Sequence, residues 1–106
     1  LDAKAQALIG KMGPAFSANL RHAREALEPL ARDEWTADRI LEALKHSAEA
    51  RGVKLGDALQ PVRVALTGST VSEPVNELLS IVDRATAIGR LREVEFQWGR
   101  ADSTSA

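Results

Sequence analysis

GVKLGDALQPVRVALTG, residues 52–68, combines strong helix formers with the glycines and the proline that mark helix ends. Proline suits the first turn of a helix, so Gln60-Pro61 predicts a helix start, and Thr67-Gly68 predicts its end. Between them, helical spacing places three apolar side chains toward a core: Val62, Ala65 and Leu66. The run therefore predicts a short buried helix with Arg63 projecting from it.

Two further helices are predicted after this run. Ser72 is expected to be an N-cap, with Glu73 and Pro74 in the first turn of a helix that ends near Asp83. Its buried positions are expected to be Val75, Leu78, Leu79 and Val82. The last helix is expected to bury Ile88, Leu91, Val94 and Phe96, and to carry Arg84, Arg90 and Arg92 on its other sides.

Three helices are predicted before the run. The first extends from Asp2 to Ile9, and the second from Gly13-Pro14 to about Ala31. The third begins at the N-cap Thr36 and ends at Gly52 as a left-handed C-cap. The apolar stripes of the second and third are Phe16, Leu20, Ala23, Leu27, Leu30 and Ile40, Leu41, Leu44, Ala48.

The composition agrees with an all-α fold. The chain has 106 residues, among them 18 Ala and 13 Leu, with few β-branched residues and four aromatic ones. No alternating strand pattern persists. We therefore predict a small bundle or cage of five to six helices. We expect one domain over residues 1–100, a flexible tail over 101–106, and a longer parent chain of which this is a piece.

Charge and residue types limit the function classes. The net charge is −1, but residues 25–50 carry −4 and residues 51–72 carry +2, which leaves a local RNA contact open. There is no cysteine, so disulfides and thiolate sites are excluded. Glu42, His46 and Glu49 share a helix face without a second histidine, and we expect no metal site. No membrane span is expected either, and a cytoplasmic location is our default.

The order of these features resembles the C-terminal anticodon-binding domain of bacterial glutamyl-tRNA synthetases, which are class I aminoacyl-tRNA synthetases. The resemblance covers roughly residues 16–95. The matching positions are Trp35-Thr36, Gly52, Pro61, Arg63, Ala65, Thr67, Gly68, Ser72, Glu77 and Arg90-Leu91. It implies an all-helical fold that holds the anticodon stem-loop of a tRNA. It also implies an ATP-dependent glutamate–tRNA ligase as the parent, whose catalytic domain and ATP site lie outside these residues.

The same resemblance implies which residues contact RNA. Arg63 would hydrogen-bond an anticodon base, and the start of the following helix would form a second contact edge. The expected RNA-binding set is Arg63, Ser72, Glu73, Pro74, Val75 and Asn76. Two of them depart from the family pattern: Glu73 replaces the usual proline after the serine, and Asn76 stands where many members carry phenylalanine. No cofactor and no catalytic residue are expected in this chain, and we expect a monomer that does not bind DNA.

Other interpretations fit part of the sequence. Arg63 could be a structural arginine that caps carbonyls or pairs with Glu77. Residues 65–79 could form a helix-turn-helix, although such motifs have turns of about three or four residues and the turn from Gly68 to Ser72 is longer. A stand-alone helical module that binds a protein partner through the acidic 25–50 segment is the third possibility.

Overall fold

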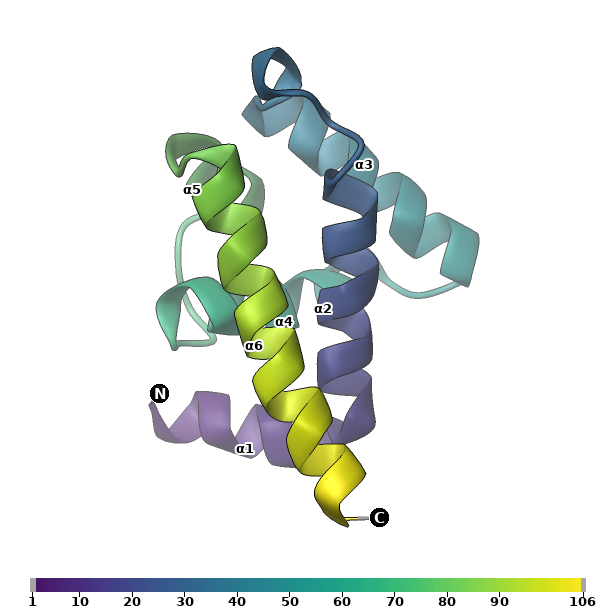
Figure 1. The fold of residues 1–106 in the computed structure, drawn as a ribbon, viewed down its shortest axis with the longest axis vertical. Helices are drawn as coiled ribbons and strands as arrows, with labels where there is room; N and C mark the ends of the chain where they lie inside the picture. The colour runs from purple at the N-terminus through teal and green to yellow at the C-terminus, as the bar shows by residue number, and fades with distance from the viewer. Residues whose placement is uncertain (1, 106) are drawn as a thin grey trace.

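The structure, a computed structural model, describes residues 2–105 in its backbone and residues 2–98 in its side chains. Over this part of the chain it contains six α-helices and one short 3-10 helix, and no strand (Figure 1). This confirms the predicted all-α class and helix number. No helix within the described residues is long and apolar enough to cross a membrane.

Helices α2 and α6 form the centre of the fold. α2 (Pro14–Leu27) and α6 (Arg84–Ser105) lie side by side and antiparallel, and α6 is the principal packing partner of α2. Phe16, Leu20 and Leu27 of α2 and Leu91 of α6 are fully buried in the shared core. Phe16 also meets Trp98 edge to face, with ring centroids 6.2 Å apart. The predicted apolar stripe of the second helix is thus the core stripe, although Leu30 is only half-buried.

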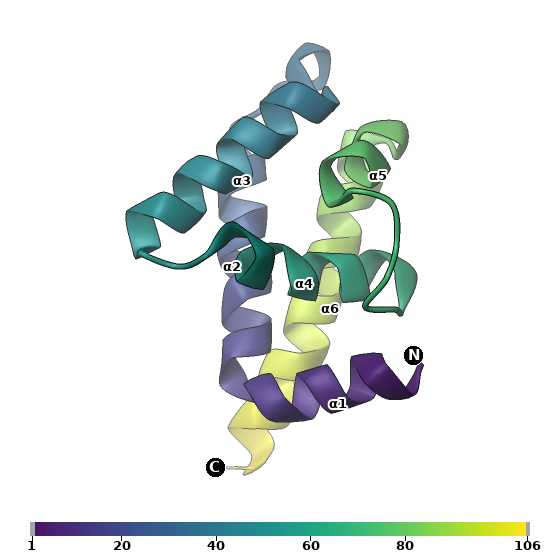
Figure 2. The ribbon, with the colours of Figure 1, turned by 180° about the vertical axis from the view of Figure 1, so that it is seen from behind.

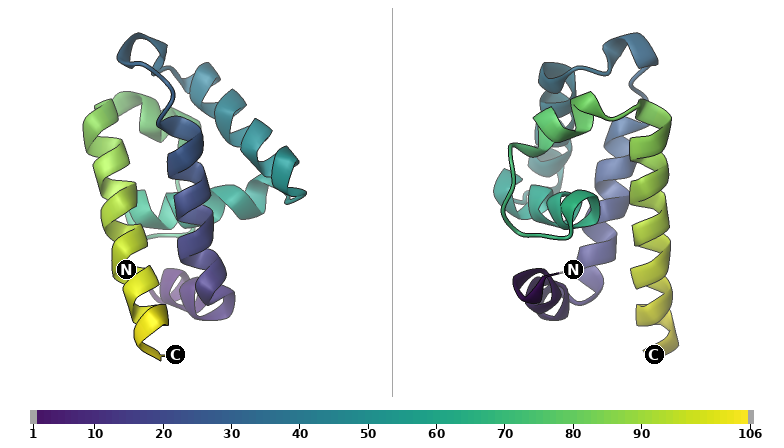
Figure 3. Two further views of the ribbon diagram at one scale, coloured as in Figure 1. Left: turned by 45° about the vertical axis from the view of Figure 1, so that its right-hand side comes forward. Right: turned by 90° about the vertical axis from the view of Figure 1, so that its left-hand side faces the viewer.

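The remaining helices cover one side of this pair, as seen from behind in Figure 2. α4 (Leu55–Thr67) crosses α2 and α6, while α3 (Ala37–Arg51) and the short α5 (Val75–Ile81) lie at one end and α1 (Ala3–Met12) at the other. Figure 3 shows that the connection between α4 and α5 stands at the edge of the fold, away from the α2–α6 pair. That connection is therefore a surface feature held by α4.

Several helix boundaries differ from the prediction. α1 continues through Gly10 to Met12, with Gly13 as its C-cap. α2 ends at Leu27: Glu28 still has helical backbone angles, but Pro29 has no N–H to continue the helical hydrogen bonds. A 3-10 turn, η1 (Arg32–Glu34), follows α2 and was not predicted. Thr36 and Gly52 do cap α3, as expected, with Gly52 in the left-handed region.

The prediction that a helix starts at Gln60-Pro61 was wrong. α4 begins at Leu55, so Pro61 lies inside it and is fully buried. Proline cannot bond the carbonyl four residues earlier. That residue is Asp57, which is exposed. The buried Pro61 ring adds apolar contact to the core, although it removes one hydrogen bond from α4.

Phe96 was also predicted wrongly. Its side chain is 67% exposed, while Val94 and Trp98 on the same helix are half-buried. Phe96 is two residues from Val94 and Trp98, which is half a helical turn and so the opposite face. α6 extends to Ser105, beyond the predicted domain end. The side chains after Trp98 lie outside the described residues, so the flexibility of 101–106 stays a prediction.

Long polar side chains fasten the helix ends. Arg84 donates to the carbonyls of Glu28 and Leu30 after the end of α2, at 2.6 Å each. The indole N–H of Trp35 donates to the carbonyls of Leu79 (2.8 Å) and Val82 (3.0 Å) at the end of α5. These donors satisfy carbonyls that helix ends leave unpaired, and they dock α5 and α6 on the rest of the fold.

Two glycine substitutions should change stability in opposite directions. Gly52 has φ +68, a conformation that other residues adopt at a cost, so Gly52→Ala should lower the free energy of unfolding by about 1 kcal/mol. Gly89 lies exposed within α6, and an added Cβ meets nothing within 4 Å. Gly89→Ala should therefore raise the free energy of unfolding by about 0.5–1 kcal/mol. Urea unfolding, monitored by circular dichroism, measures both changes. If both substitutions changed the free energy of unfolding in the same direction, the conformations described for Gly52 and Gly89 would be contradicted.

His22 should make stability depend on pH. Partial burial lowers the pKa of His22 from its ordinary 6.5, Arg51 and Arg21 lower it further, and Glu25 opposes them. Below 6.5 the unfolded chain then binds the proton more readily than the folded one, so folding loses stability as the pH falls through this window. We expect the thermal midpoint to fall less in His22→Gln than in wild type between about pH 7.5 and pH 5.5. Equal falls would exclude this role.

Candidate nucleic-acid interface

Arg63 lies where α4 faces the α4–α5 connection. Its Nε–H donates to the Ser72 hydroxyl at 2.9 Å, and its Nη1 donates to the Gln60 side-chain oxygen. The side chain is half-buried, and Nη2 has no hydrogen-bond partner among the described residues. A guanidinium has five N–H donors, so donor capacity remains for a ligand. The structure thus brings together two of the predicted residues, Arg63 and Ser72.

Neither of the two alternative structural roles of Arg63 is seen among the described residues. Its guanidinium caps no carbonyl there and forms no ion pair with Glu77. Its partners are instead neutral side chains, a hydroxyl and an amide oxygen. A neutral shell fixes the guanidinium without cancelling its positive charge, which leaves that charge able to act on an anion.

Ser72 does not cap α5, contrary to the prediction. The N-cap is Pro74, with φ −52 and ψ 135, and the helix begins at Val75. Glu73 precedes a proline and is biased toward extended backbone, so the helix starts too late for the Ser72 hydroxyl to reach its first N–H groups. The hydroxyl instead accepts from Arg63 and donates to the carbonyl of Glu73 at 2.8 Å.

The other predicted contact residues divide between surface and interior. Glu73 and Pro74 are exposed beside Ser72, whereas Val75 is buried and 1% exposed. Asn76 is half-buried, and its amide donates to the carbonyl of Ala37 at the start of α3 at 3.2 Å. The Val75 side chain is therefore part of the core, and the Asn76 amide docks α5 on α3.

Sequence reasoning missed Gln60 and Asp2, which both hold the α4–α5 connection. Gln60 accepts from Arg63 and donates to the carbonyl of Thr70 at 3.4 Å. Asp2 donates its backbone N–H to the carbonyl of Gly68 at 3.0 Å. Its carboxyl has a pKa below the ordinary 3.8, because the Ala5 backbone N–H and then Ser69 donate hydrogen bonds to it.

The spacing of Gln60 and Arg63, three residues apart on one helix, could have indicated their pairing. Nothing in the local sequence indicated the Asp2 contacts, because they depend on how α1 packs.

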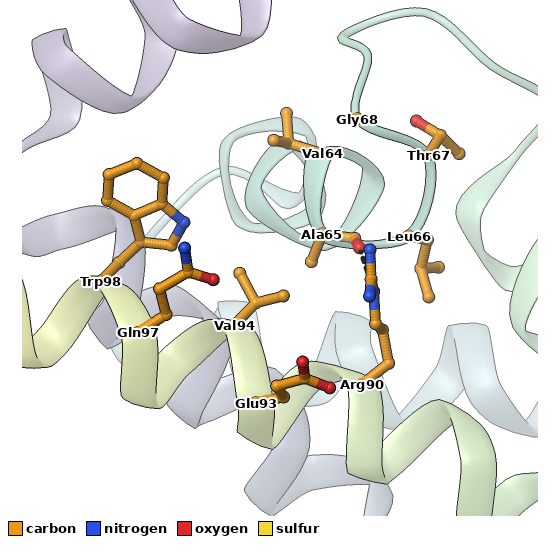
Figure 4. A pocket seen from close by; sticks show the side chains of 10 residues that line it. All are labelled: Val64, Ala65, Leu66, Thr67, Gly68, Arg90, Glu93, Val94, Gln97 and Trp98. Atoms are coloured by element: carbon orange, nitrogen blue, oxygen red, sulfur yellow. Dashed lines mark hydrogen bonds between the residues drawn. The ribbon is translucent and has the colours of Figure 1, made fainter. Parts of the chain in front are cut away.

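A separate hollow of about 400 Å³ lies between the C-terminal half of α4 and α6 (Figure 4). Arg90 extends from α6 toward α4 and donates its Nε–H to the carbonyl of Ala65 at 3.0 Å, while Glu93 and Gln97 lie along the same side of α6. None of the predicted RNA-binding residues lines it. Since Arg90 is engaged with α4 and Glu93 adds negative charge, this hollow does not favour an anionic backbone.

The histidines lie along the groove between α2 and α3. His22, Glu25 and His46 border a space of about 340 Å³ there. Among the described side chains, no group of three or more His, Cys, Asp or Glu residues is placed to hold a metal ion.

The helix-turn-helix interpretation does not fit the geometry. α4 ends at Thr67 and α5 begins at Val75, so the connection 68–74 exceeds a turn of about three or four residues. The buried Val75 and the short α5 also leave little helix to enter a groove.

Comparison with known proteins agrees with the sequence resemblance. A family model described as an anticodon binding domain matches residues 2–95. Glutamate–tRNA ligase 1 of Methylorubrum extorquens is 42% identical over 93 residues, which are 88% of this chain and 19% of that protein. Glutamate–tRNA ligase 2 of Rhodospirillum rubrum is 38% identical over 95 residues, 90% of this chain and 19% of the relative. No solved structure matches significantly.

The chain thus spans about a fifth of the length of the curated relatives it matches. The family model covers nearly all the described side chains, including Arg63, Ser72 and the connection between them. The protein therefore belongs to the anticodon-binding domain family found in glutamate–tRNA ligases.

Proposed function

We propose that this chain recognises the anticodon loop of a tRNA as the C-terminal domain of a glutamate–tRNA ligase. One observation carries the proposal: the half-buried Arg63 guanidinium is held by neutral groups beside an exposed connection, in a chain of the anticodon-binding family. Anticodon loops offer unstacked bases with free hydrogen-bonding edges. A fixed arginine fork suits such an edge, because it donates two hydrogen bonds in a defined plane.

The charge distribution supports a local contact. The 51–72 segment carries +2 in a chain of net charge −1, and Arg63 lies within it. A broad basic surface would attract any nucleic acid through its phosphates. A single oriented arginine adds little of this general attraction, but it can distinguish one base from another. Glu73 is exposed and follows Ser72, so its negative charge disfavours phosphates at this end of the connection.

The remaining features of the parent protein are part of the same proposal. The ligase would attach glutamate to tRNA with ATP in a catalytic domain outside these residues, so this chain holds no cofactor and forms no bond itself. Its work would be to bind and verify the anticodon. We also propose that the domain acts as a monomer, that it does not use DNA as a ligand, and that the ligase is cytoplasmic.

Binding to RNA tests the proposal directly. A labelled tRNA(Glu) anticodon stem-loop should bind in fluorescence anisotropy, and the same hairpin with its anticodon bases exchanged should bind more weakly. A DNA hairpin of the same sequence is the control. Affinity should fall with salt, with a shallow slope set by few phosphate contacts. Absence of any RNA binding at low salt would contradict the proposal and favour a protein-interaction module.

A further inference from the structure

Gln60 links the proposed base-reading arginine to the connection beside it. We propose that Gln60 is a positioning residue that fixes the Arg63 guanidinium for base recognition, an inference that rests on the function proposed above. Its side-chain oxygen accepts from Nη1 of Arg63, and its amide nitrogen donates to the carbonyl of Thr70 at 3.4 Å. Gln60 thus joins Arg63 to the connection through these two hydrogen bonds, beside the direct bond from Arg63 to Ser72.

The hydrogen bonds around Gln60 close a circuit. Arg63 bonds Gln60 on one side and the Ser72 hydroxyl on the other, at 2.9 Å, and Gln60 returns to the same connection at Thr70. The circuit thus joins one turn of α4 to both ends of the 70–72 segment. Each member limits the others, so the plane of the guanidinium is set before a ligand arrives.

An amide suits this position better than a carboxylate. Glutamine supplies one acceptor and a donor group in the same side chain, which the circuit uses for Arg63 and Thr70. A glutamate at this place would keep the acceptor for Arg63 and lose the donor to Thr70. It would also cancel the charge of Arg63 and repel the RNA backbone.

Prior fixation of a long side chain should strengthen binding. Arginine has many rotamers, and binding that fixes the side chain in one of them costs conformational entropy, which lowers the affinity. Since Gln60 and Ser72 already select it, removal of Gln60 should weaken binding of the matching anticodon by about 3- to 10-fold. The loss should be smaller for mismatched loops, which gain less from a correctly oriented fork.

Gln60 can be changed without opening the core. It is half-buried and borders a groove of about 350 Å³ between α1 and α4, together with Leu8, Lys11, Met12 and Asp57. A shorter side chain at this position leaves space that water can fill, not a buried cavity, so the free energy of unfolding should change little. Effects of Gln60 variants on RNA are thus separable from effects on folding.

The experiment combines a double-mutant cycle with base-exchanged loops. Binding of the anticodon stem-loop is measured for wild type, Gln60→Ala, Arg63→Ala and the double variant. If Gln60 acts through Arg63, the double variant should bind no more weakly than Arg63→Ala. Gln60→Glu should also bind weakly, with a salt dependence lower by about one phosphate contact. Gln97→Ala, an exposed glutamine of α6, is the matched control and should bind like wild type.

A second readout follows Arg63 itself. The Nε–H resonance of Arg63 should exchange slowly with water in wild type and faster in Gln60→Ala, while the thermal midpoint stays unchanged. Additive losses in the cycle, full base discrimination in Gln60→Ala, or an unaltered Arg63 resonance would each overturn the inference. If wild type binds no RNA, the proposed function fails and the inference with it. If wild type binds RNA and Gln60→Ala still discriminates fully between anticodon sequences, only the inference about Gln60 fails and the proposed function stands.

Discussion

Phe16→Ala should lower the free energy of unfolding by about 3–5 kcal/mol, the largest stability change we expect from one substitution. Phe16 is 0% exposed, lies between α2 and α6, and contacts Trp98 edge to face. Its loss removes apolar burial and leaves a cavity that the two long helices can fill only partly, because each is held by other contacts. A domain of this size has a total of about 5–15 kcal/mol to lose.

Phe96→Ala provides the control for this experiment. It deletes the same atoms on α6, but Phe96 is 67% exposed. We expect a change within about 0.5 kcal/mol. Chemical unfolding with intrinsic tryptophan fluorescence measures both variants, and Phe16→Leu gives a milder change if Phe16→Ala does not fold. Similar losses at positions 16 and 96 would contradict the packing described here.

Arg63→Ala should weaken binding of the matching anticodon loop by about 1–3 kcal/mol and reduce discrimination against exchanged bases. The guanidinium is the only predicted contact side chain that combines a positive charge with unused donors among the described residues. Arg63→Lys keeps the charge but replaces the planar fork with a single ammonium group. It should therefore keep most of the salt dependence and lose most of the base discrimination.

Arg92→Ala is the matched control for Arg63. It removes the same charge from α6, where Arg92 pairs with Glu28 at 2.9 Å and is 61% exposed. Its effect on RNA affinity should be small and independent of the anticodon sequence. Titration of labelled hairpins with each variant measures both effects. Unchanged affinity and selectivity in Arg63→Ala would remove Arg63 from the interface.

The fold was predictable where one local signal sufficed. The spacing of Phe16, Leu20 and Leu27 predicted the buried stripe of α2, and Thr36 and Gly52 predicted both ends of α3. Local signals failed where they competed with packing. Pro61 suggested a helix start, yet the burial of its ring lets α4 begin a turn and a half earlier. Phe96 looked like a core residue by its type, although its angular position on α6 turns it outward.

Some residues of the candidate site could be predicted from the sequence, but most of their hydrogen bonds could not. Resemblance indicated Arg63 and Ser72, and the structure joins them at 2.9 Å. The assignment of Ser72 as an N-cap failed because Pro74 delays the helix. Val75 and Asn76 were expected at the contact edge, but their side chains serve the core and the contact with α3, which only the packing of α5 could show.

The antiparallel pairing of α2 and α6 has a consequence for synthesis of the chain. The two helices that share most of the core lie far apart in sequence. The Phe16 side chain is therefore covered completely only after Trp98 has been synthesised. Closing so long a loop costs entropy before any contact compensates for it, which slows folding. On the ribosome, α2 to α5 can pack on one another before α6 emerges, but the face of α2 that α6 covers stays open until α6 has left the exit tunnel.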